Sequence, residues 1–227
     1  MVSEVLKIET PKEDSHISSL LLKTYMVHPL CERLKRPEAK SALELGCRFP
    51  LSFFPLFHRF GFTEFHGVDQ DTKEQAMSKF LAQNKRLQAA DPQNFYEIYR
   101  SVFKKFGADS QPVLQDQQAF EALFEPNLNW ETDVFDYMKA LPADKKFDFI
   151  SMINLLHLLP NVDKMWELIN LALDHLAPDG VLYFRVFKSK NYNIREFLDQ
   201  VQERLDKGSL LFYQPKEGLQ YFKLLYY

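Results

Sequence analysis

The sequence of 227 residues predicts one α/β domain, in which buried parallel strands alternate with helices. Three observations favour this class. Short apolar runs alternate with stretches of helical periodicity, the seven glycines punctuate them, and 46% hydrophobic residues suffice for one sizeable core. A single α/β domain with an elaboration therefore fits this chain better than two equal domains.

The first forty residues are expected to form a helical cover. Residues 15–35 have dense apolar spacing that predicts a helix, which Pro29 should kink or divide. We therefore assign residues 1–40 to an N-terminal cover and residues 41–227 to the α/β domain.

The first strand of the domain is predicted over residues 41–45, an apolar run that ends at Gly46. Residues 51–60 then predict a helix that Gly61 ends. The second strand is predicted within residues 64–71 and has Asp69 near its end. Nucleotide-binding folds place an acidic ribose acceptor about twenty positions beyond the glycine turn, which fits Asp69.

Residues 72–125 differ in character from what precedes them. They contain three helical patterns, whereas a simple crossover between parallel strands needs only one helix. The sequence therefore predicts a helical insertion at about residues 73–126.

The remaining elements return to the alternation of strands and helices. They are a third strand ending near Asp133, a fourth strand over residues 147–153, a helix from Asn161 with Pro178 and Gly180 beyond its end, a fifth strand over residues 181–187, a helix over residues 194–205, and a closing antiparallel hairpin of residues 209–215 and 219–227.

Composition excludes several function classes. A net charge of −3 from interspersed charges argues against a broad nucleic-acid surface. The two cysteines, Cys31 and Cys47, are too few for a disulfide framework or a thiolate metal site, so we expect no metal. The sequence has no apolar run of membrane-spanning length and no signal-peptide pattern, so we expect a cytoplasmic protein without a membrane partner.

Five stretches carry a resemblance to a known family: ALELGC, FHGVDQD, TDVFDYMKALP, KKFDFISMINLLHLLPN and LAPDGVLYFRVF. In this order they resemble class I S-adenosylmethionine-dependent methyltransferases, from about Ser41 to Tyr227. The resemblance implies a Rossmann-like methyltransferase fold with a doubly wound, mostly parallel, seven-stranded sheet and an antiparallel C-terminal hairpin. It also implies S-adenosyl-L-methionine as the cofactor.

The resemblance assigns the cofactor site by position. Glu44 is similar to the acidic residue near the donor's ammonium group, and Gly46 matches the first glycine of the turn. Asp69 matches the carboxylate that accepts from both ribose hydroxyls. Asp133, with Val134 beside it, matches the residue that meets the adenine amino group.

Alternatives remain for several of these residues. Glu44 could instead cap the following turn, and Asp71 competes with Asp69 for the ribose. Asp136 competes with Asp133 for the adenine, and either aspartate could instead be a helix N-cap.

The weak candidates for catalysis are Asn154 and His157, which follow the fourth strand at the rim where acceptors of this family bind. Packing is the competing explanation for His157.

The turn after the first strand departs from the family pattern, because Arg48 and Pro50 stand where further glycines are usual. S-adenosylmethionine has no phosphate, so its loop need not cradle anionic oxygens. Arg48 and Pro50 could still obstruct the backbone's approach to the donor. The turn is therefore either a remodelled donor pocket or a vestigial one.

Two hypotheses follow. The first is a methyltransferase that transfers the sulfonium methyl directly to a small-molecule acceptor, with Phe95, Tyr96, Tyr99 and Phe103 of the insertion as a candidate lid or as plain packing. The alternative is a catalytically inactive methyltransferase-like protein that binds a protein partner through its insertion or through residues 15–35. A dinucleotide oxidoreductase is disfavoured by the broken glycine pattern.

Overall fold

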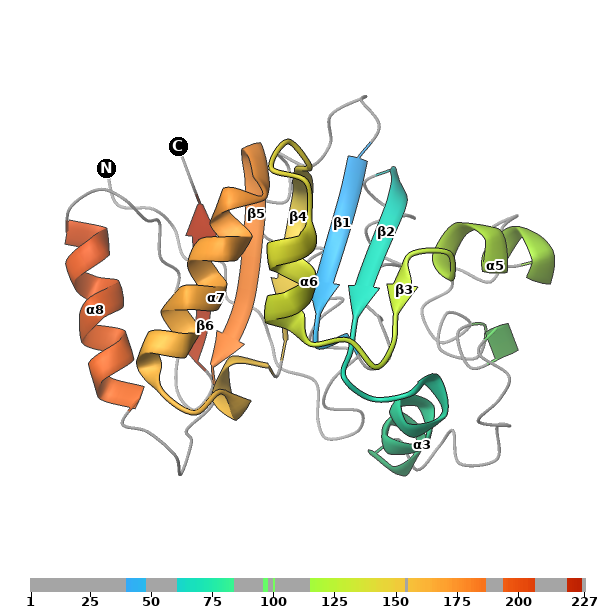
Figure 1. Ribbon diagram of the computed structural model, residues 1–227, viewed down its shortest axis with the longest axis horizontal. Coiled ribbons are helices and arrows are strands. Elements are labelled where there is room, and N and C mark those ends of the chain that lie inside the picture. Colours follow the sequence, from blue (N-terminus) through green and yellow to red (C-terminus); the bar gives the residue numbers. More distant parts are fainter. Residues whose placement is uncertain are drawn as a thin grey trace, which may run out of the picture.

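The computed structural model describes residues 40–47, 61–83, 96–97, 100, 115–153, 155–186, 194–206 and 220–225. Within them, six strands form one sheet in the order β3-β2-β1-β4-β5-β6 (Figure 1). Neighbouring strands are parallel except for β5 and β6, which are antiparallel. This confirms the doubly wound, mostly parallel, Rossmann-like fold, with six described strands where seven were expected.

The strands are β1 (Lys40–Leu45), β2 (Phe62–Val68), β3 (Leu128–Asn129), β4 (Phe147–Met152), β5 (Leu176–Val186) and β6 (Gln220–Leu225). The helices are α3 (Lys73–Gln83), α5 (Gln117–Phe124), α6 (Val134–Ala140), the 3₁₀ turn η4 (Leu156–Leu158), α7 (Val162–Asp174) and α8 (Ile194–Asp206). No helix among them is long and apolar enough to cross a membrane.

The order in which strands are added to the sheet reverses at β1, because β2 and β3 lie on one side of it and β4 and β5 on the other. In open α/β sheets of this kind, ligands bind outside the carboxyl ends of the strands where the order reverses. The fold therefore directs attention to the ends of β1, β2 and β4.

Helix α7 shows how the sequence builds the main core. Asn161 caps it by accepting from the Lys164 amide at 2.9 Å, and Met165, Leu168 and Ile169 lie on its buried stripe. Figure 1 shows α6 and α7 on one face of the sheet. Their apolar stripes and that face of β1, β4 and β5 form one continuous core.

The start of β5 corrects the sequence interpretation. The sequence periodicity extends the helical stripe that begins after Asn161 as far as Leu176, but Leu176 lies in β5 and pairs with Phe147. Pro178 and Gly180 lie inside the same strand and not beyond the end of a helix. The β4–β5 register shifts between Phe147 and Phe149, and such an irregularity accommodates a proline, which cannot donate to the ladder.

The third strand is also shorter than predicted. It ends at Asn129, not near Asp133, because the chain turns away at Glu131, whose φ of +55° lies in the left-handed region. The Thr132 hydroxyl closes this turn by donating to the Trp130 carbonyl at 2.9 Å.

A second cluster of aromatic side chains joins β2 to α5. Phe65 contacts Phe124 with ring centroids 5.0 Å apart, Phe124 contacts Phe120, and Phe120 contacts Tyr96. Because Tyr96 is buried in this cluster, its observed role is packing.

Several expectations fall outside the described residues. These are the cover helix at residues 15–35, the helix at residues 51–60, the first arm of the hairpin at residues 209–215, and Phe95, Tyr99 and Phe103 of the insertion. The domain boundaries at residue 40 and the insertion at about residues 73–126 stay predictions.

Candidate functional site

The turn after β1 is fixed by the end of β2. The amides of Gly46 and Cys47 both donate to the Val68 carbonyl, at 2.8 and 3.0 Å. Gly46 has a φ of +66°, and a Cβ added to it would lie 3.2 Å from Cδ1 of Leu155. Glycine is therefore required here for its left-handed backbone and for the close approach of the segment after β4.

Two predicted acidic residues come together at this turn. Glu44 and Asp69 are both 4% exposed, at the ends of β1 and β2. Burial, and then the charges of Glu44 and Asp69, raise the pKa of the Cys47 thiol well above its ordinary value. Both carboxylates thus lie close enough to one sulfur atom to raise its pKa.

The contacts of Asp71 separate it from Asp69. The Asp71 amide donates to Oδ1 of Asp69 at 2.9 Å, and Nζ of Lys79 lies 2.7 Å from each carboxylate oxygen of Asp71. Lys79 therefore holds both oxygens of the Asp71 carboxylate, whereas Oδ1 of Asp69 accepts from a backbone amide.

Asp133 is the N-cap of α6, the alternative that the sequence left open. Its Oδ1 accepts from the amides of Phe135 and Asp136 at 2.8 and 3.2 Å. The preceding residue, Thr132, donates its amide to the Asp69 carbonyl at 3.0 Å, so Asp133 stays beside the end of β2. Asp136 lies within α6.

Val134, the predicted neighbour of Asp133 at the adenine, has its side chain in the main core at 8% exposure. This leaves its backbone as the part of Val134 able to meet a ligand.

The segment after β4 reaches the same place. Leu155 packs against Gly46, and half-buried His157 follows in η4. Asn154 lies outside the described residues, as do Arg48 and Pro50 of the turn. The obstruction that those two residues could cause stays a prediction.

Sequence reasoning missed Ser151. It pairs in register with Glu44 across β1 and β4, so the two side chains lie on the same face of the sheet. Its hydroxyl is fully buried and has no hydrogen-bond partner among the described residues. A serine inside the apolar strand 147–153 was the available signal. A buried hydroxyl without a hydrogen-bond partner lowers the stability of a fold, so its position beside Glu44 makes Ser151 a candidate to bind a polar ligand.

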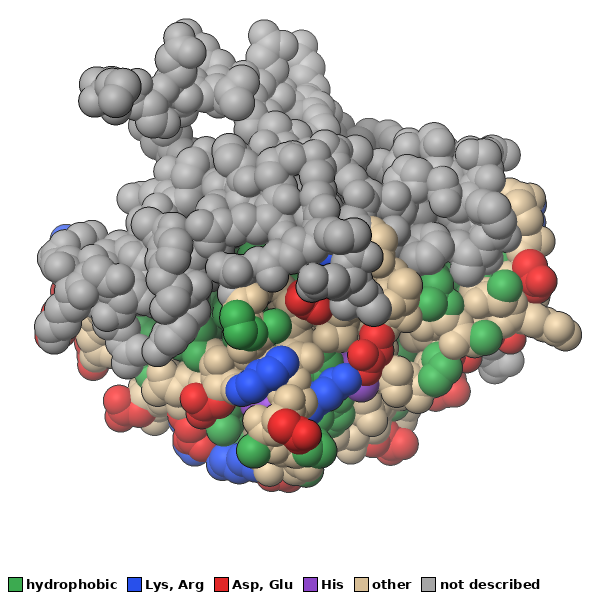
Figure 2. Space-filling view, turned by 90° about the horizontal axis from the view of Figure 1, so that it is seen from above, with side chains coloured by type: hydrophobic (Ala, Val, Ile, Leu, Met, Phe, Trp, Pro, Cys, Tyr) green, Lys and Arg blue, Asp and Glu red, His purple; other side chains and the backbone are tan. Residues whose placement is uncertain are grey.

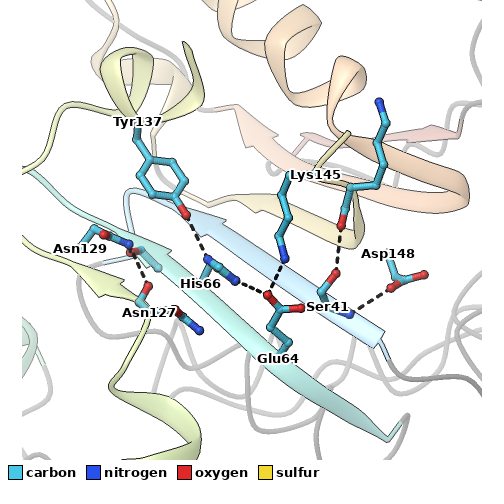
Figure 3. A network of polar contacts seen from close by, with 10 residues as sticks. Ser41, Glu64, His66, Asn127, Asn129, Tyr137, Lys145 and Asp148 are labelled. Atoms are coloured by element: carbon cyan, nitrogen blue, oxygen red, sulfur yellow. Dashed lines mark hydrogen bonds and ion pairs between the residues drawn. The ribbon is translucent and has the colours of Figure 1, made fainter. Parts of the chain in front are cut away.

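A different polar network lies nearer the amino ends of the strands (Figure 3). Nε2 of His66 donates to Glu64 at 2.6 Å, and Nδ1 of His66 lies 3.1 Å from the Tyr137 hydroxyl. Lys145 donates to the same Glu64 oxygen. Figure 2 looks onto this end of the sheet and shows basic, acidic and histidine side chains side by side.

Burial raises the pKa of the Glu64 carboxyl, but the hydrogen bonds and charges of Lys145 and His66 outweigh it, so the pKa falls below its ordinary value. These contacts link the described side chains of Glu64, His66, Tyr137 and Lys145 to one another, an arrangement typical of a cluster that stabilises the fold. Among the residues that the structure describes, no group of three or more His, Cys, Asp or Glu side chains could hold a metal ion.

Comparison with solved structures finds methyltransferase-like folds at low identity. WbdD, solved in complex with the kinase inhibitor LY294002, is 13% identical, with a TM-score of 0.50 over 93% of this chain and 41% of WbdD. The CcbJ methyltransferase from Streptomyces caelestis is 16% identical, with a TM-score of 0.42 over 74% of this chain and 49% of CcbJ. CalS10 from Micromonospora echinaspora, an amino pentose methyltransferase solved with S-adenosylmethionine, is 14% identical, with a TM-score of 0.38 over 79% of this chain and 60% of CalS10.

These likenesses bear on the fold alone. The chain spans 41–60% of the length of these three proteins. No curated protein matches the sequence. The model of the family described as "Methyltransferase domain" matches residues 21–223, which is most of the chain. The chain therefore belongs to the methyltransferase-domain family, and its doubly wound sheet is that of the class I S-adenosylmethionine-dependent methyltransferases.

Proposed function

We propose that this chain binds S-adenosyl-L-methionine and transfers its methyl group to a small-molecule acceptor in the cytoplasm. One observation carries the proposal: Glu44, Gly46 and Asp69 converge at the adjoining ends of β1 and β2 in a chain of methyltransferase family. Sites at this edge of a doubly wound sheet are where such folds bind their cofactors.

The residues present fit this cofactor. After burial, the charges of Glu44 and Asp69 raise the pKa of Cys47, and the same two carboxylates are suited to a donor that carries both a sulfonium and an ammonium group. Gly46 gives the turn after β1 its left-handed backbone and its close packing against Leu155. The hydroxyl of Ser151, beside Glu44, is a buried polar group suited to a polar ligand.

In the proposed mechanism, the donor when bound supplies an electrophilic methyl group, so the protein needs no covalent intermediate. Glu44 stabilises the ammonium group, and Asp69 accepts from the ribose hydroxyls. Asp133 and the Val134 backbone lie on the adenine side. The chain's part in catalysis is to align the reactants and to exclude water.

The acceptor side of the proposal involves the rim after β4. His157 and Asn154 follow this strand and are the candidates to orient an acceptor or to take its proton. The low, interspersed charge of the chain supports a small molecule over a nucleic acid.

Calorimetric titration with S-adenosylmethionine and S-adenosylhomocysteine tests the donor site. We expect micromolar binding by the wild type and a loss of about 10- to 100-fold in Asp69→Asn, because one charge-assisted acceptor is lost. Glu64→Gln, which removes a carboxylate from the opposite end of β2, is the control and keeps wild-type affinity. Absence of binding at millimolar ligand contradicts the proposal and favours the inactive, partner-binding alternative.

Labelled-methyl transfer tests the acceptor class. The protein is incubated with methyl-labelled S-adenosylmethionine and three separate pools of acceptors: dialysable metabolites, nucleic acids and proteins. We expect label in the dialysable pool. Label confined to nucleic acid or protein contradicts the small-molecule part of the proposal.

A further inference from the structure

We propose that Lys79 is a positioning residue for the donor site: by holding Asp71, it keeps the Asp69 carboxylate oriented for the ribose. This inference rests on the proposed function, because it deepens the role given to Asp69. Lys79 does not reach the donor in this proposal and acts only through Asp71.

The first step is the ion pair itself. Nζ of Lys79 lies 2.7 Å from both oxygens of Asp71, a symmetric contact that uses the whole carboxylate. The Asp71 side chain is 12% exposed, whereas that of Lys79 is 51% exposed. The lysine thus covers a nearly buried carboxylate from the solvent side.

The second step is the link from Asp71 to Asp69. The Asp71 amide donates to Oδ1 of Asp69 at 2.9 Å, which fixes the rotation of the Asp69 side chain. The Asp71 carbonyl accepts from the Glu131 amide at 3.1 Å, and the Asp69 carbonyl accepts from the Thr132 amide at 3.0 Å. The ion pair and these hydrogen bonds therefore tie residues 69–71 both to α3 and to the turn that leads into α6. Figure 1 shows β2 leading into α3 and β3 leading into α6.

The third step is electrostatic. Asp69 and Asp71 are two buried acidic residues separated by one residue. Like charges at this separation repel, and an Asp71 without its lysine would turn away or compete for the ribose hydroxyls. The ion pair with Lys79 offsets the charge of Asp71 and keeps this carboxylate directed toward α3.

The chain offers a matched control on the same helix. Lys73 also lies on α3 and also makes an ion pair, with Glu125 at 2.9 Å. That pair ties α3 to the end of α5 and does not involve residues 69–71. Lys73→Met and Lys79→Met therefore each remove a lysine charge and the ion pair described for it, but only the second change affects the Asp71 carboxylate.

The test compares S-adenosylhomocysteine with its 2′-deoxy analogue by calorimetry. The ratio of the two affinities measures how much the ribose hydroxyl contributes. We expect the wild-type preference for the hydroxyl to fall by about fivefold or more in Lys79→Met, to persist in Lys73→Met, and to return in Lys79→Arg, which can pair with Asp71 through two donors. A loss of stability alone would weaken both ligands equally and leave the ratio unchanged.

A second measurement needs no ligand. Hydrogen exchange at the amides of Asp71 and Glu131 should be faster in Lys79→Met than in wild type and unchanged in Lys73→Met. Unaltered exchange and an unaltered ratio in Lys79→Met overturn the inference while the donor site stands. Failure of the wild type to bind either ligand overturns the proposed function, and the exchange result then decides by itself whether Lys79 orders residues 69–71.

Discussion

The two ends of the sheet combine charged side chains in different ways. Toward the amino ends, Glu64 is held by His66 and Lys145, so charges of opposite sign meet (Figure 3). At the carboxyl ends, Glu44 and Asp69 are more deeply buried and bring charges of the same sign close to the Cys47 thiol. In the first arrangement the acidic side chain has basic partners beside it, whereas the second places two acidic side chains where the proposed cationic donor would bind.

The shifts in pKa follow this contrast. Around Glu64, basic partners outweigh burial and lower the pKa of the carboxyl. Around Cys47, burial and two carboxylates act in the same direction and raise the pKa of the thiol. The following four predictions break or sharpen this comparison, in order of decreasing effect.

The largest effect concerns the Cys47 thiol, which is 5% exposed and disfavoured as a thiolate. In a Cys31→Ser background, Cys47 is the single thiol of the chain. We expect an aromatic disulfide reagent at mildly alkaline pH to modify it on the order of 1,000-fold more slowly in the folded than in the unfolded protein. Equal rates of modification in the folded and unfolded protein would show that the fold does not protect the Cys47 thiol.

The next effect concerns the turn after β1. Gly46 and Gly61 have nearly the same φ, +66° and +69°, but an added Cβ meets Leu155 at 3.2 Å only at Gly46 and nothing within 4 Å at Gly61. We expect Gly61→Ala to lower the free energy of unfolding by about 1 kcal/mol from backbone strain, and Gly46→Ala by about 2–3 kcal/mol from strain and crowding. Denaturant titration measures both, and equal losses would refute the close approach of Leu155.

A smaller effect is expected from Tyr137→Phe at the opposite end. The change removes the hydroxyl that lies 3.1 Å from Nδ1 of His66, and it should cost about 1 kcal/mol of unfolding free energy. Because this network is structural, affinity for S-adenosylhomocysteine should stay at the wild-type value. A matching loss of affinity would mean that the two ends of the sheet are coupled.

The smallest effect is a dependence of stability on pH. Burial lowers the pKa of His66, and Lys145 lowers this pKa further. Glu64 raises the pKa, but by less than burial lowers it. The uncharged groups that face His66 are Tyr137 and Phe147. Between the ordinary histidine pKa and this lower one, the unfolded chain binds more protons, so stability falls as the pH falls.

The measurement compares wild type with His66→Gln. Denaturant titrations between about pH 7 and pH 5.5 should show a shallower decline of the unfolding free energy in the variant. Parallel declines would assign the effect to other groups.

The pattern of apolar residues predicted most of the fold. Strands β1, β2 and β4 and the stripe of α7 follow directly from periodicity and caps. Pro178 and Gly180 were misleading, because a register shift between strands, which local sequence does not encode, places them inside β5. Strand β3 was extended too far for a similar reason, since Glu131 adopts a backbone conformation unusual for its residue type.

The candidate site was predictable where chain order alone decides it. The carboxyl ends of neighbouring parallel strands must adjoin, so Glu44, Gly46 and Asp69 could be expected to meet, while their roles toward a ligand stay predictions. The contact of Lys79 with Asp71 depends on how α3 packs, and the position of Ser151 beside Glu44 depends on strand register. Neither of these two arrangements can be predicted from the residues next to them in the sequence.

The carbonyl of Val68 has one more consequence. It receives two successive amides, those of Gly46 and Cys47, which therefore point back into the sheet. A loop that grips pyrophosphate must present such N–H groups outward to the anionic oxygens. Because the amides of Gly46 and Cys47 both donate to the Val68 carbonyl, neither of these two amides is available to bind a pyrophosphate. A turn that does not present its amides to a phosphate has no need of the further glycines that allow this. This is a physical reason why the chain can have Arg48 and Pro50 just beyond Cys47.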